Sequence, residues 1–316
     1  MLKQLGKFLM IVFGAIFALL LISLVYHRFM LSREKDKLQP LGKIVDLPQG
    51  RMSIYDSGPA EGQDTLIFLP GGGTCSPILD FRSLTNLLEG DFRVVVIEKF
   101  GYGFSDDVSG PRDNGHLLEE VRSALADLGI RGPYVVCPHS MSGILSLYWA
   151  QKHPEEIKAI IGLDMALPVH YEKMEFNPVL LKLGQFVAST GIFRFLPVAS
   201  ESEAIKYGKL TDEEKEIYKA IFYSRTANQT MLNEVDAIKE NAKEVSQGPW
   251  PDIPILLLLS DGSGGTGFSK EDWRNLTLSG LPESDKIRIV SFDAPHYIHN
   301  HEYENINELI RAFLQH

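Results

Sequence analysis

The heptapeptide Cys137-Pro138-His139-Ser140-Met141-Ser142-Gly143 is the stretch that decides the fold. It follows a short apolar run, Tyr134–Cys137, and opens a stretch with helical spacing, Ser140–Gln151. On a tight turn from strand to helix, a serine side chain projects above the sheet and the next backbone amide points into the same space. The pattern therefore predicts that the Ser140 hydroxyl and the Met141 amide face one site.

Two further loops also follow predicted strands. Pro70-Gly71-Gly72-Gly73-Thr74 comes after the apolar run Thr65–Leu69, and its glycines allow backbone amides to approach a carbonyl oxygen. Asp293-Ala294-Pro295-His296-Tyr297-Ile298-His299 lies between the last predicted strand and the last predicted helix. A histidine in that loop can reach over the sheet to the serine.

The rest of the chain alternates apolar, β-branched runs with stretches of helical periodicity. Strands are expected at 43–47 and 51–56, as a hairpin, and at 65–69, 92–97, 134–137, 157–163, 253–259 and 286–291; helices are expected at 78–88, 116–128, 140–151 and 303–314. This alternation predicts an α/β fold with a mostly parallel sheet and helices on both faces.

Almost ninety residues separate the strand that ends at Leu163 from the strand that begins at Ile253. Helical spacing recurs in this segment at 179–187, 201–207, 212–222 and 228–246. We interpret residues 166–250 as a helical cap over the carboxyl edge of the sheet, where such sheets bind ligands. The apolar stretch Phe176–Leu196 is expected to pack in part on the domain and in part around an acyl pocket.

Composition limits the class of protein. Of the 316 residues 44% are apolar and 23% are charged, which is the balance of a folded globular chain. The net charge of −10 disfavours nucleic acid as a partner, because that role needs a dense basic surface. Two cysteines are too few for a disulfide scaffold or a cysteine-rich zinc module.

The amino-terminal run Phe8–Tyr26 contains 19 residues without a charge, which is close to the length that spans a bilayer. A signal peptide would have a shorter apolar run and a small-residue cleavage site, and Val25-Tyr26-His27-Arg28-Phe29 offers none. We therefore expect an uncleaved single-pass anchor in residues 1–40, with an exposed charged linker over 31–41, and a folded domain in residues 41–316.

The membrane orientation of this anchor is predicted differently by two rules. Two Lys or Arg residues precede the run and four follow it, which places the carboxyl-terminal side inside. An amino-terminal tail of only seven residues ahead of a signal anchor usually stays inside, which places the domain outside the cell membrane. We favour the extracytoplasmic side.

Together, these stretches resemble the α/β-hydrolase superfamily over essentially all of residues 41–316. The matching stretches are 68–74, 94–106, the turn around Ser140 and 294–299. The chain looks most like bacterial membrane-anchored serine hydrolases. The resemblance implies a Ser140 nucleophile, a His296 base, an acid between them in sequence, and the Gly72 and Met141 amides as an oxyanion hole. It implies a small-molecule acyl substrate and neither a metal nor another cofactor.

The sequence departs from the family pattern at three positions. The usual Gly-x-Ser-x-Gly has Pro138 in place of its first glycine and Ser142 in place of its second. Pro70 stands where the family often has a histidine before the glycines. An aspartate nucleophile, which epoxide and haloalkane chemistry on this fold requires, is absent at position 140.

Two aspartates satisfy the chain order of serine, acid and histidine. Asp164 ends the strand that is expected beside the nucleophile's strand, and Asp261 ends the strand beside the one that leads to His296. Some branches of the superfamily place the acid at the first position and others near Ser263. We favour Asp164 as the acid and keep Asp261 as the alternative.

Other groups near these loops have simpler interpretations. His299 and His301 could form a metal site with His296, but a completing ligand cluster is not evident nearby, so we expect both to be solvated. His139 is expected to be a packing residue. Cys75 and Cys137 could pair in a disulfide if the domain is outside the membrane, although buried free thiols are commoner.

These features predict a serine hydrolase that cleaves a carboxylic ester or related acyl compound through an acyl-enzyme. The alternatives are a non-catalytic hydrolase-like protein that binds a small ligand, and a membrane-associated metal hydrolase that uses the carboxyl-terminal histidines.

Overall fold

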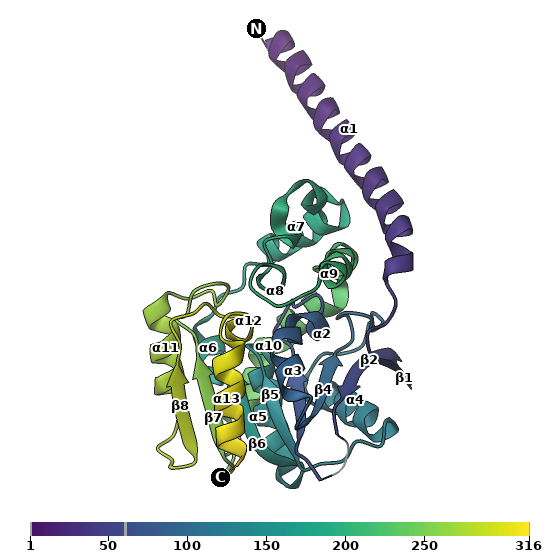
Figure 1. The fold of residues 1–316 in the computed structure, drawn as a ribbon. Helices are drawn as coiled ribbons and strands as arrows, with labels where there is room; N and C mark the ends of the chain where they lie inside the picture. Colours follow the sequence, from purple (N-terminus) through teal and green to yellow (C-terminus); the bar gives the residue numbers. More distant parts are fainter. Residues whose placement is uncertain (1, 60–61, 316) are drawn as a thin grey trace.

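An eight-stranded sheet forms the centre of the molecule (Figure 1) in the computed structural model, which describes residues 2–59 and 62–315. The strand order is β1-β2-β4-β3-β5-β6-β7-β8. The strands are β1 Lys43–Leu47, β2 Gly50–Ser57, β3 Thr65–Leu69, β4 Arg93–Glu98, β5 Tyr134–Pro138, β6 Ile157–Leu163, β7 Ile255–Leu259 and β8 Ile287–Ser291. The pairs β1–β2 and β2–β4 are antiparallel, and all other neighbours are parallel.

Helices cover both faces of this sheet. Helices α4 (Asn114–Asp127) and α5 (Ser142–Lys152) pack on one face, and α3 (Arg82–Leu88) and α13 (Tyr303–Leu314) pack on the other. The side chains of β3 alternate between the two cores, and all five are buried. This two-sided burial explains why the parallel strands are continuous apolar runs rather than alternating ones.

The segment between β6 and β7 is helical and lies over the end of the sheet that carries Ser140 (Figure 1). Its elements are α6 Pro168–Lys173, α7 Pro178–Ser189, the 3-10 turns Ile192–Phe195 and Pro197–Ala199, α8 Glu203–Lys206, α9 Asp212–Arg225 and α10 Gln229–Ser246. Side chains of Asn177, Thr211 and Asn228 accept backbone hydrogen bonds at the starts of α7, α9 and α10. Helix α10 packs against α5 and α6 and thereby joins the cap to the sheet.

Three helical features differ from the sequence-based expectation. The region expected as one helix over 78–88 is two helices, α2 (Pro77–Asp80) and α3, separated at Phe81. Helix α5 begins at Ser142, because Ser140 adopts a left-handed backbone conformation with φ of 50°. Helices α11 (Lys270–Ser279) and α12 (Ile298–His301) were not predicted.

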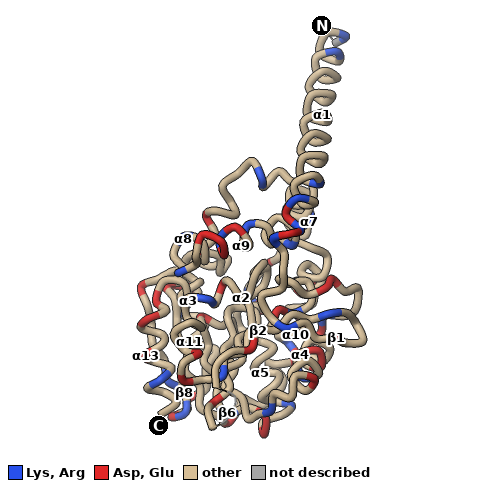
Figure 2. The backbone as a smooth tube through the Cα atoms, turned by 45° about the vertical axis from the view of Figure 1, so that its right-hand side comes forward, with Lys and Arg blue, Asp and Glu red and all other residues tan. Residues whose placement is uncertain are grey.

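Helix α1 (Leu2–Glu34) projects away from the body of the protein (Figure 1). Its middle has no charged side chains, so basic residues mark only its two ends (Figure 2). At 1.5 Å per residue it is about 50 Å long, which exceeds the hydrocarbon thickness of a bilayer. By length and composition it can cross a membrane.

The expected linker over 31–41 is wrong at its start. Residues 31–34 continue α1, and the Glu34 carboxylate pairs with the Arg194 guanidinium of the cap at 2.7 Å. The side chain of Glu34 is therefore mostly shielded from water in an ion pair, a contact that a local sequence pattern does not reveal.

Glu98, at the end of β4, is a buried acid whose charge is only partly compensated. Its Oε2 accepts the Phe104 amide at 2.8 Å, and its Oε1 has no hydrogen-bond partner among the described residues. A Cβ at position 103 would lie 1.9 Å from Oε1, so only Gly103, with φ of 52°, fits beside it. Burial raises the pKa of Glu98 from 4.5 to about 7.

We predict that Glu98 makes the protein less stable as pH rises from about 4.5 to 7. In that window the folded state keeps a proton that the unfolded chain releases, so the free energy of unfolding falls by up to about 3 kcal/mol. In Glu98→Gln, which cannot titrate, the free energy of unfolding should lose this part of its dependence on pH. Urea unfolding of the detergent-solubilised chain at several pH values measures it, with Glu271→Gln, on the exposed first turn of α11, as control. Equal slopes for wild type and Glu98→Gln would contradict the prediction.

Candidate active site

Ser140 lies on the tight turn between β5 and α5. Its φ of 50° is rare for a residue with a side chain, and the neighbouring structure holds it there. The Ala166 amide donates to the Ser140 carbonyl at 2.9 Å, and a Cβ on Gly71 would lie 2.9 Å from the Ser140 Cβ. The side chain is half-buried and lines a cavity.

The unusual Ser142 joins this turn to the glycine-rich loop. Its Oγ donates to the Pro70 carbonyl at 2.5 Å, and the Lys99 ammonium lies 3.4 Å from the same Oγ. The strand-to-helix approach is closest one position later, since a Cβ on Gly143 would lie 2.3 Å from the Ala166 carbonyl oxygen. The shift from the usual glycine to Ser142 therefore keeps the turn compact and adds a bond between two loops of the site.

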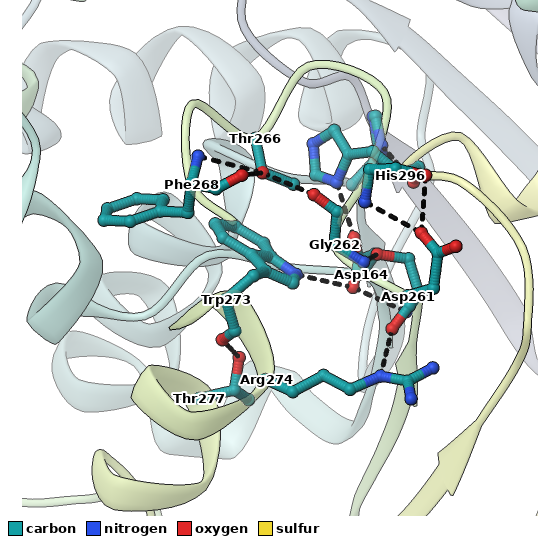
Figure 3. Close-up of polar contacts among 12 residues, drawn as sticks. Asp164, Asp261, Gly262, Thr266, Phe268, Trp273, Arg274, Thr277 and His296 are labelled. Atoms are coloured by element: carbon teal, nitrogen blue, oxygen red, sulfur yellow. Dashed lines mark hydrogen bonds and ion pairs between the residues drawn. The ribbon is translucent and has the colours of Figure 1, made fainter. Parts of the chain in front are cut away.

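The loop after β8 places the His296 ring against Asp164 (Figure 3). The His296 Nδ1 lies 2.5 Å from Asp164 Oδ2. The other carboxylate oxygen accepts the Ser260 amide at 2.8 Å and the Trp273 indole Nε1–H at 3.0 Å. Both Asp164 and His296 are buried. Of the two candidate acids, the structure therefore places Asp164, the one favoured from the sequence, against His296.

Asp164 is built to remain ionised inside the protein. Burial alone would raise its pKa, but hydrogen bonds from His296 and Ser260 outweigh that effect and hold the pKa of Asp164 below its ordinary value. A buried carboxylate that accepts from Nδ1 fixes the tautomer in which His296 Nε2 is free to accept a proton.

Asp261, the alternative acid, has other partners. Its carboxylate pairs with the Lys270 ammonium and accepts the Ser263 amide at 2.8 Å. Burial works to raise its pKa, but Lys270 and Ser263 lower the pKa of Asp261 to about 2. The side chain stabilises its own loop, and among the described residues no hydrogen bond joins it to the His296 ring.

Two backbone amides are available beside Ser140. Among the residues that the structure describes, no hydrogen bond uses the amide of Gly72 or of Met141. The two residues are in contact, because a Cβ on Gly72 would lie 3.0 Å from the Met141 Cε. Amides that are not used elsewhere can both donate to one oxygen, as an oxyanion hole requires.

His139 is a buried packing residue, as expected. Its ring lies 4.7 Å from each of the rings of His296, Tyr297 and His299, and its Nε2 is 3.2 Å from the His296 carbonyl oxygen. Burial and the neighbouring imidazoles hold the pKa of His139 well below its usual value. The His139 ring is therefore neutral, and it supports the position of His296 by a hydrogen bond to the His296 backbone carbonyl.

The expectation that His299 and His301 are solvated is wrong. His299 is fully buried, with Nε2 2.7 Å from Asp80 Oδ2, because α12 turns it toward α2. His301 is mostly buried, with its Nε2 2.7 Å from Glu203 Oε2 in the cap. Both histidines hold the loop of His296 in place through carboxylates far away in the sequence.

One metal-capable cluster includes these groups. Asp80, His139 and His299 each place one ligand atom within 4.8 Å of the others, a donor set that zinc accepts. In this structure two of these groups, His299 and Asp80, are hydrogen-bonded to each other. Asn300 Nδ2 donates to the second Asp80 oxygen at 3.2 Å. The cluster thus has an evident role in supporting the loop after β8.

The cavity at Ser140 has a volume of about 310 Å³ and a largely apolar wall. The cap lines it with Tyr171, Met174, Phe176 and Leu181 from the region of α6 and α7, and with Met231, Leu232 and Val235 from α10. A second cavity of about 530 Å³ is lined by Gly73, Val198 and Phe222, among others. Gly73 lines both cavities, whereas Ser140 lines only the first. The cysteines nearby, Cys75 and Cys137, are both buried and free rather than paired.

Sequence reasoning missed Trp273, which donates to the Asp164 carboxylate from α11. The available signal was Ser269, whose side chain accepts the Asp272 amide at 3.1 Å as a helix cap just before Trp273. It also missed the buried pair of Lys99 and Glu234, which joins the turn of Ser140 to α10. A lysine after a predicted strand gives no hint of burial.

The comparisons with known proteins agree on one family. The family model described as alpha/beta hydrolase fold matches residues 64–303. The chain is 38% identical to the Bacillus subtilis protein YbdG over 265 residues, which are 81% of each chain. It is 32% identical over 123 residues to a bifunctional esterase/perhydrolase of Acinetobacter calcoaceticus, 39% of this chain and 44% of that one.

A solved structure of a probable hydrolytic enzyme from Pseudomonas aeruginosa has the same fold. It aligns with a TM-score of 0.65 at 17% identity, over 87% of this chain and 94% of that chain. The fold predicted from the sequence is thereby confirmed.

We predict that Glu234→Ala will destabilise the protein by about 3–5 kcal/mol, since it leaves the Lys99 ammonium buried without its partner. The double variant Lys99→Met, Glu234→Leu should recover most of that loss, because well-packed apolar side chains replace both charges. Urea unfolding measures both, and Glu240→Ala, on an exposed part of α10, is the control. A Glu234→Ala loss no larger than the control's would show that the pair does not join the cap to the sheet.

Proposed function

Because the chain belongs to the α/β-hydrolase family, we propose that it is a serine hydrolase that cleaves carboxylic esters through an acyl-enzyme. The observation that carries the proposal is the 2.5 Å contact between His296 Nδ1 and a buried Asp164, beside a serine on a strained turn. An ordinary buried salt bridge does not need a serine that lines a cavity and two unused amides next to it.

The first chemical step would be attack of Ser140 Oγ on the ester carbonyl carbon. His296 Nε2 takes the hydroxyl proton as the oxygen–carbon bond forms, and Asp164 stabilises the imidazolium. Negative charge moves to the carbonyl oxygen, where the Gly72 and Met141 amides donate to it; each such donor is worth about 3 kcal/mol in comparable sites. Collapse transfers the proton to the leaving alcohol and leaves the acyl group on Ser140.

The second step would reverse the roles with water. A water molecule gives its proton to His296 Nε2 and attacks the acyl carbon, and Ser140 recovers its proton as the free acid leaves. Among the described residues Ser140 Oγ forms no hydrogen bond, and catalytic hydrogen bonds of this kind often tighten only when substrate is bound.

An acyl ester is the substrate class that the cavities favour. Apolar side chains from the cap and α10 surround the space next to Ser140, which suits a hydrocarbon acyl group better than a charged one. The esterase activity in the name of the Acinetobacter calcoaceticus relative supports the same class.

We further propose that α1 is an uncleaved membrane anchor, and that the domain lies on the extracytoplasmic side. Ser23 and Glu34 of α1 bond to Thr190 and Arg194 of the cap, so the helix continues into the folded protein instead of ending at a cleavable junction.

We predict that a fluorophosphonate probe will label the wild-type chain and not Ser140→Ala, since only a nucleophilic serine attacks phosphorus. His296→Ala should lose labelling and ester hydrolysis as severely, because nucleophile and base act as a unit. His116→Ala, on an exposed side of α4, is the control and should keep most of its activity. Full turnover in Ser140→Ala would rule out the serine mechanism, and loss of activity on chelation in the wild type would favour a metal hydrolase. Labelling in neither protein would favour the binding-protein alternative.

We predict that Asp164→Asn will lower kcat by about 10⁴, because an amide presents the wrong partner to His296 Nδ1. Asp261→Asn should leave kcat nearly unchanged and cost only about 1 kcal/mol of stability, as for loss of a hydrogen bond in a loop. Ester hydrolysis and thermal unfolding are measured on both variants. The reverse ranking would assign the acid to Asp261, and small equal effects would indicate a serine–histidine dyad.

A further inference from the structure

Helix α7 exposes an apolar face that no residue in the described ranges 2–59 and 62–315 covers. None of its twelve residues is buried, and its one charged side chain is Lys182. Large apolar side chains on α7 and the following 3-10 turn are 47–72% exposed: Val179, Leu180, Leu183, Phe186 and Phe195. A face of this kind on a soluble protein marks contact with another apolar phase.

One side of α1 faces the same part of the cap. Residues 3–19 of α1 are all exposed. From Leu20 onward, residues at spacings of three and four along the helix are partly or fully buried and form a stripe. The stripe consists of Leu20, Ser23, Leu24, His27, Met30, Leu31 and Glu34. Figure 1 shows α7 beside the lower part of α1.

Specific contacts hold the two elements together. Ser23 Oγ donates to the Thr190 carbonyl at the end of α7 at 2.7 Å. The next residue must be Gly191, because a Cβ there would lie 2.3 Å from the His27 Cβ. The Arg194 guanidinium pairs with Glu34 and donates to His27 Nδ1 at 2.8 Å. These contacts fix the position of the cap along the axis of α1.

This arrangement places the cap inside the membrane if α1 crosses it. Ser23 lies three residues inside the uncharged run that ends at Tyr26, about 5 Å along the helix. If the bilayer stopped short of the cap, only Phe8–Leu19 would remain, which is about 18 Å of helix against about 30 Å of hydrocarbon. The bilayer therefore has to extend to the level of the Thr190 turn and the face of α7.

A crevice beside α1 lies next to the cavity at Ser140. It has a volume of about 220 Å³ and lies between His27, Arg28 and Leu31 of α1 and Gln185 and Ala188 of α7. Thr226 and Ala227 line both this crevice and the cavity at Ser140. A chain held beside α1 and the cavity at Ser140 are therefore separated by one short segment of the cap.

We propose that the apolar face of α7 and Phe195 inserts into the adjacent leaflet, and that the substrate is a lipid ester drawn from that leaflet beside α1. The proposal deepens the proposed function and rests on it for the chemistry at Ser140. Binding through a partly inserted helix, about 5–10 Å deep, is the mode typical of helices with one strongly apolar face.

Insertion is tested on the full chain reconstituted in phosphatidylcholine–phosphatidylglycerol vesicles. Leu183→Cys carries an environment-sensitive fluorophore, and Leu278→Cys, equally exposed on α11, is the matched control. The native cysteines are buried, and the unsubstituted chain serves as the labelling blank. Emission from position 183 should shift to the blue and be quenched about twofold or more by lipids with a shallow nitroxide, the depth expected for an inserted face, with no change at 278.

Absence of quenching at 183 would overturn the proposal. Quenching that vanishes on dilution of the protein in lipid, with cross-links between copies through position 183, would assign the face to a second copy and would also overturn it.

Substrate class is tested with two esters. The double variant Leu183→Asp, Phe186→Asp should hydrolyse a diacylglycerol in vesicles about tenfold more slowly or worse, while its rate on a water-soluble butyrate ester stays at the wild-type level. A wild type that cleaves the butyrate ester but no vesicle lipid would overturn the lipid substrate and leave the hydrolase standing. A wild type that cleaves neither would overturn the hydrolase, whereas the quenching result would still decide insertion.

Discussion

The site depends on a carboxylate that is kept charged without access to water. Asp164 is fully buried, and it has this environment because Ser260, Trp273 and His296 all donate to it. These donors come from the end of β7, from α11 and from the loop after β8, so three elements must be in place before the acid can be ionised. An unpaired buried charge would cost several kcal/mol, and the hydrogen bonds offset that cost. The charge of Asp164 therefore depends on the arrangement of β6, β7 and β8 as neighbours in the sheet.

A second buried charge pair performs a comparable role on the other side of Ser140. The Lys99 ammonium contacts Ser142 Oγ and the Glu234 carboxylate, so the turn of the serine is connected to α10 of the cap. Burial lowers the pKa of Lys99, and Glu234 acts in the opposite direction. Because removal of either partner leaves a charge inside the protein, the cap and the turn are expected to keep their relative position during a reaction.

Features that depend on neighbours in sequence could be predicted, and features that depend on distant partners could not. Strand Ile157–Leu163 and helix Tyr303–Leu314 have the bounds that their apolar patterns predict. The burial of His299 depends on Asp80, 219 residues away, so its pattern resembles that of a solvated histidine. The choice between Asp164 and Asp261 had the same limit, because both end strands next to the site and only the directions of their side chains separate them.

If α1 anchors the protein as proposed, its position gives the exposed apolar face of α7 a physical explanation. An ester in water would have to pass a cap whose outer surface on α7 is hydrocarbon, an arrangement that favours aggregation unless lipid covers it. With α1 bonded to the cap at Ser23 and Glu34, the length of the uncharged run sets how deep that surface lies. In the proposed arrangement a shorter run would pull more of the domain into the bilayer, and a longer one would lift α7 out of it. The proposal therefore couples the length of α1 to the position of the cap over Ser140, although the two are far apart in the sequence.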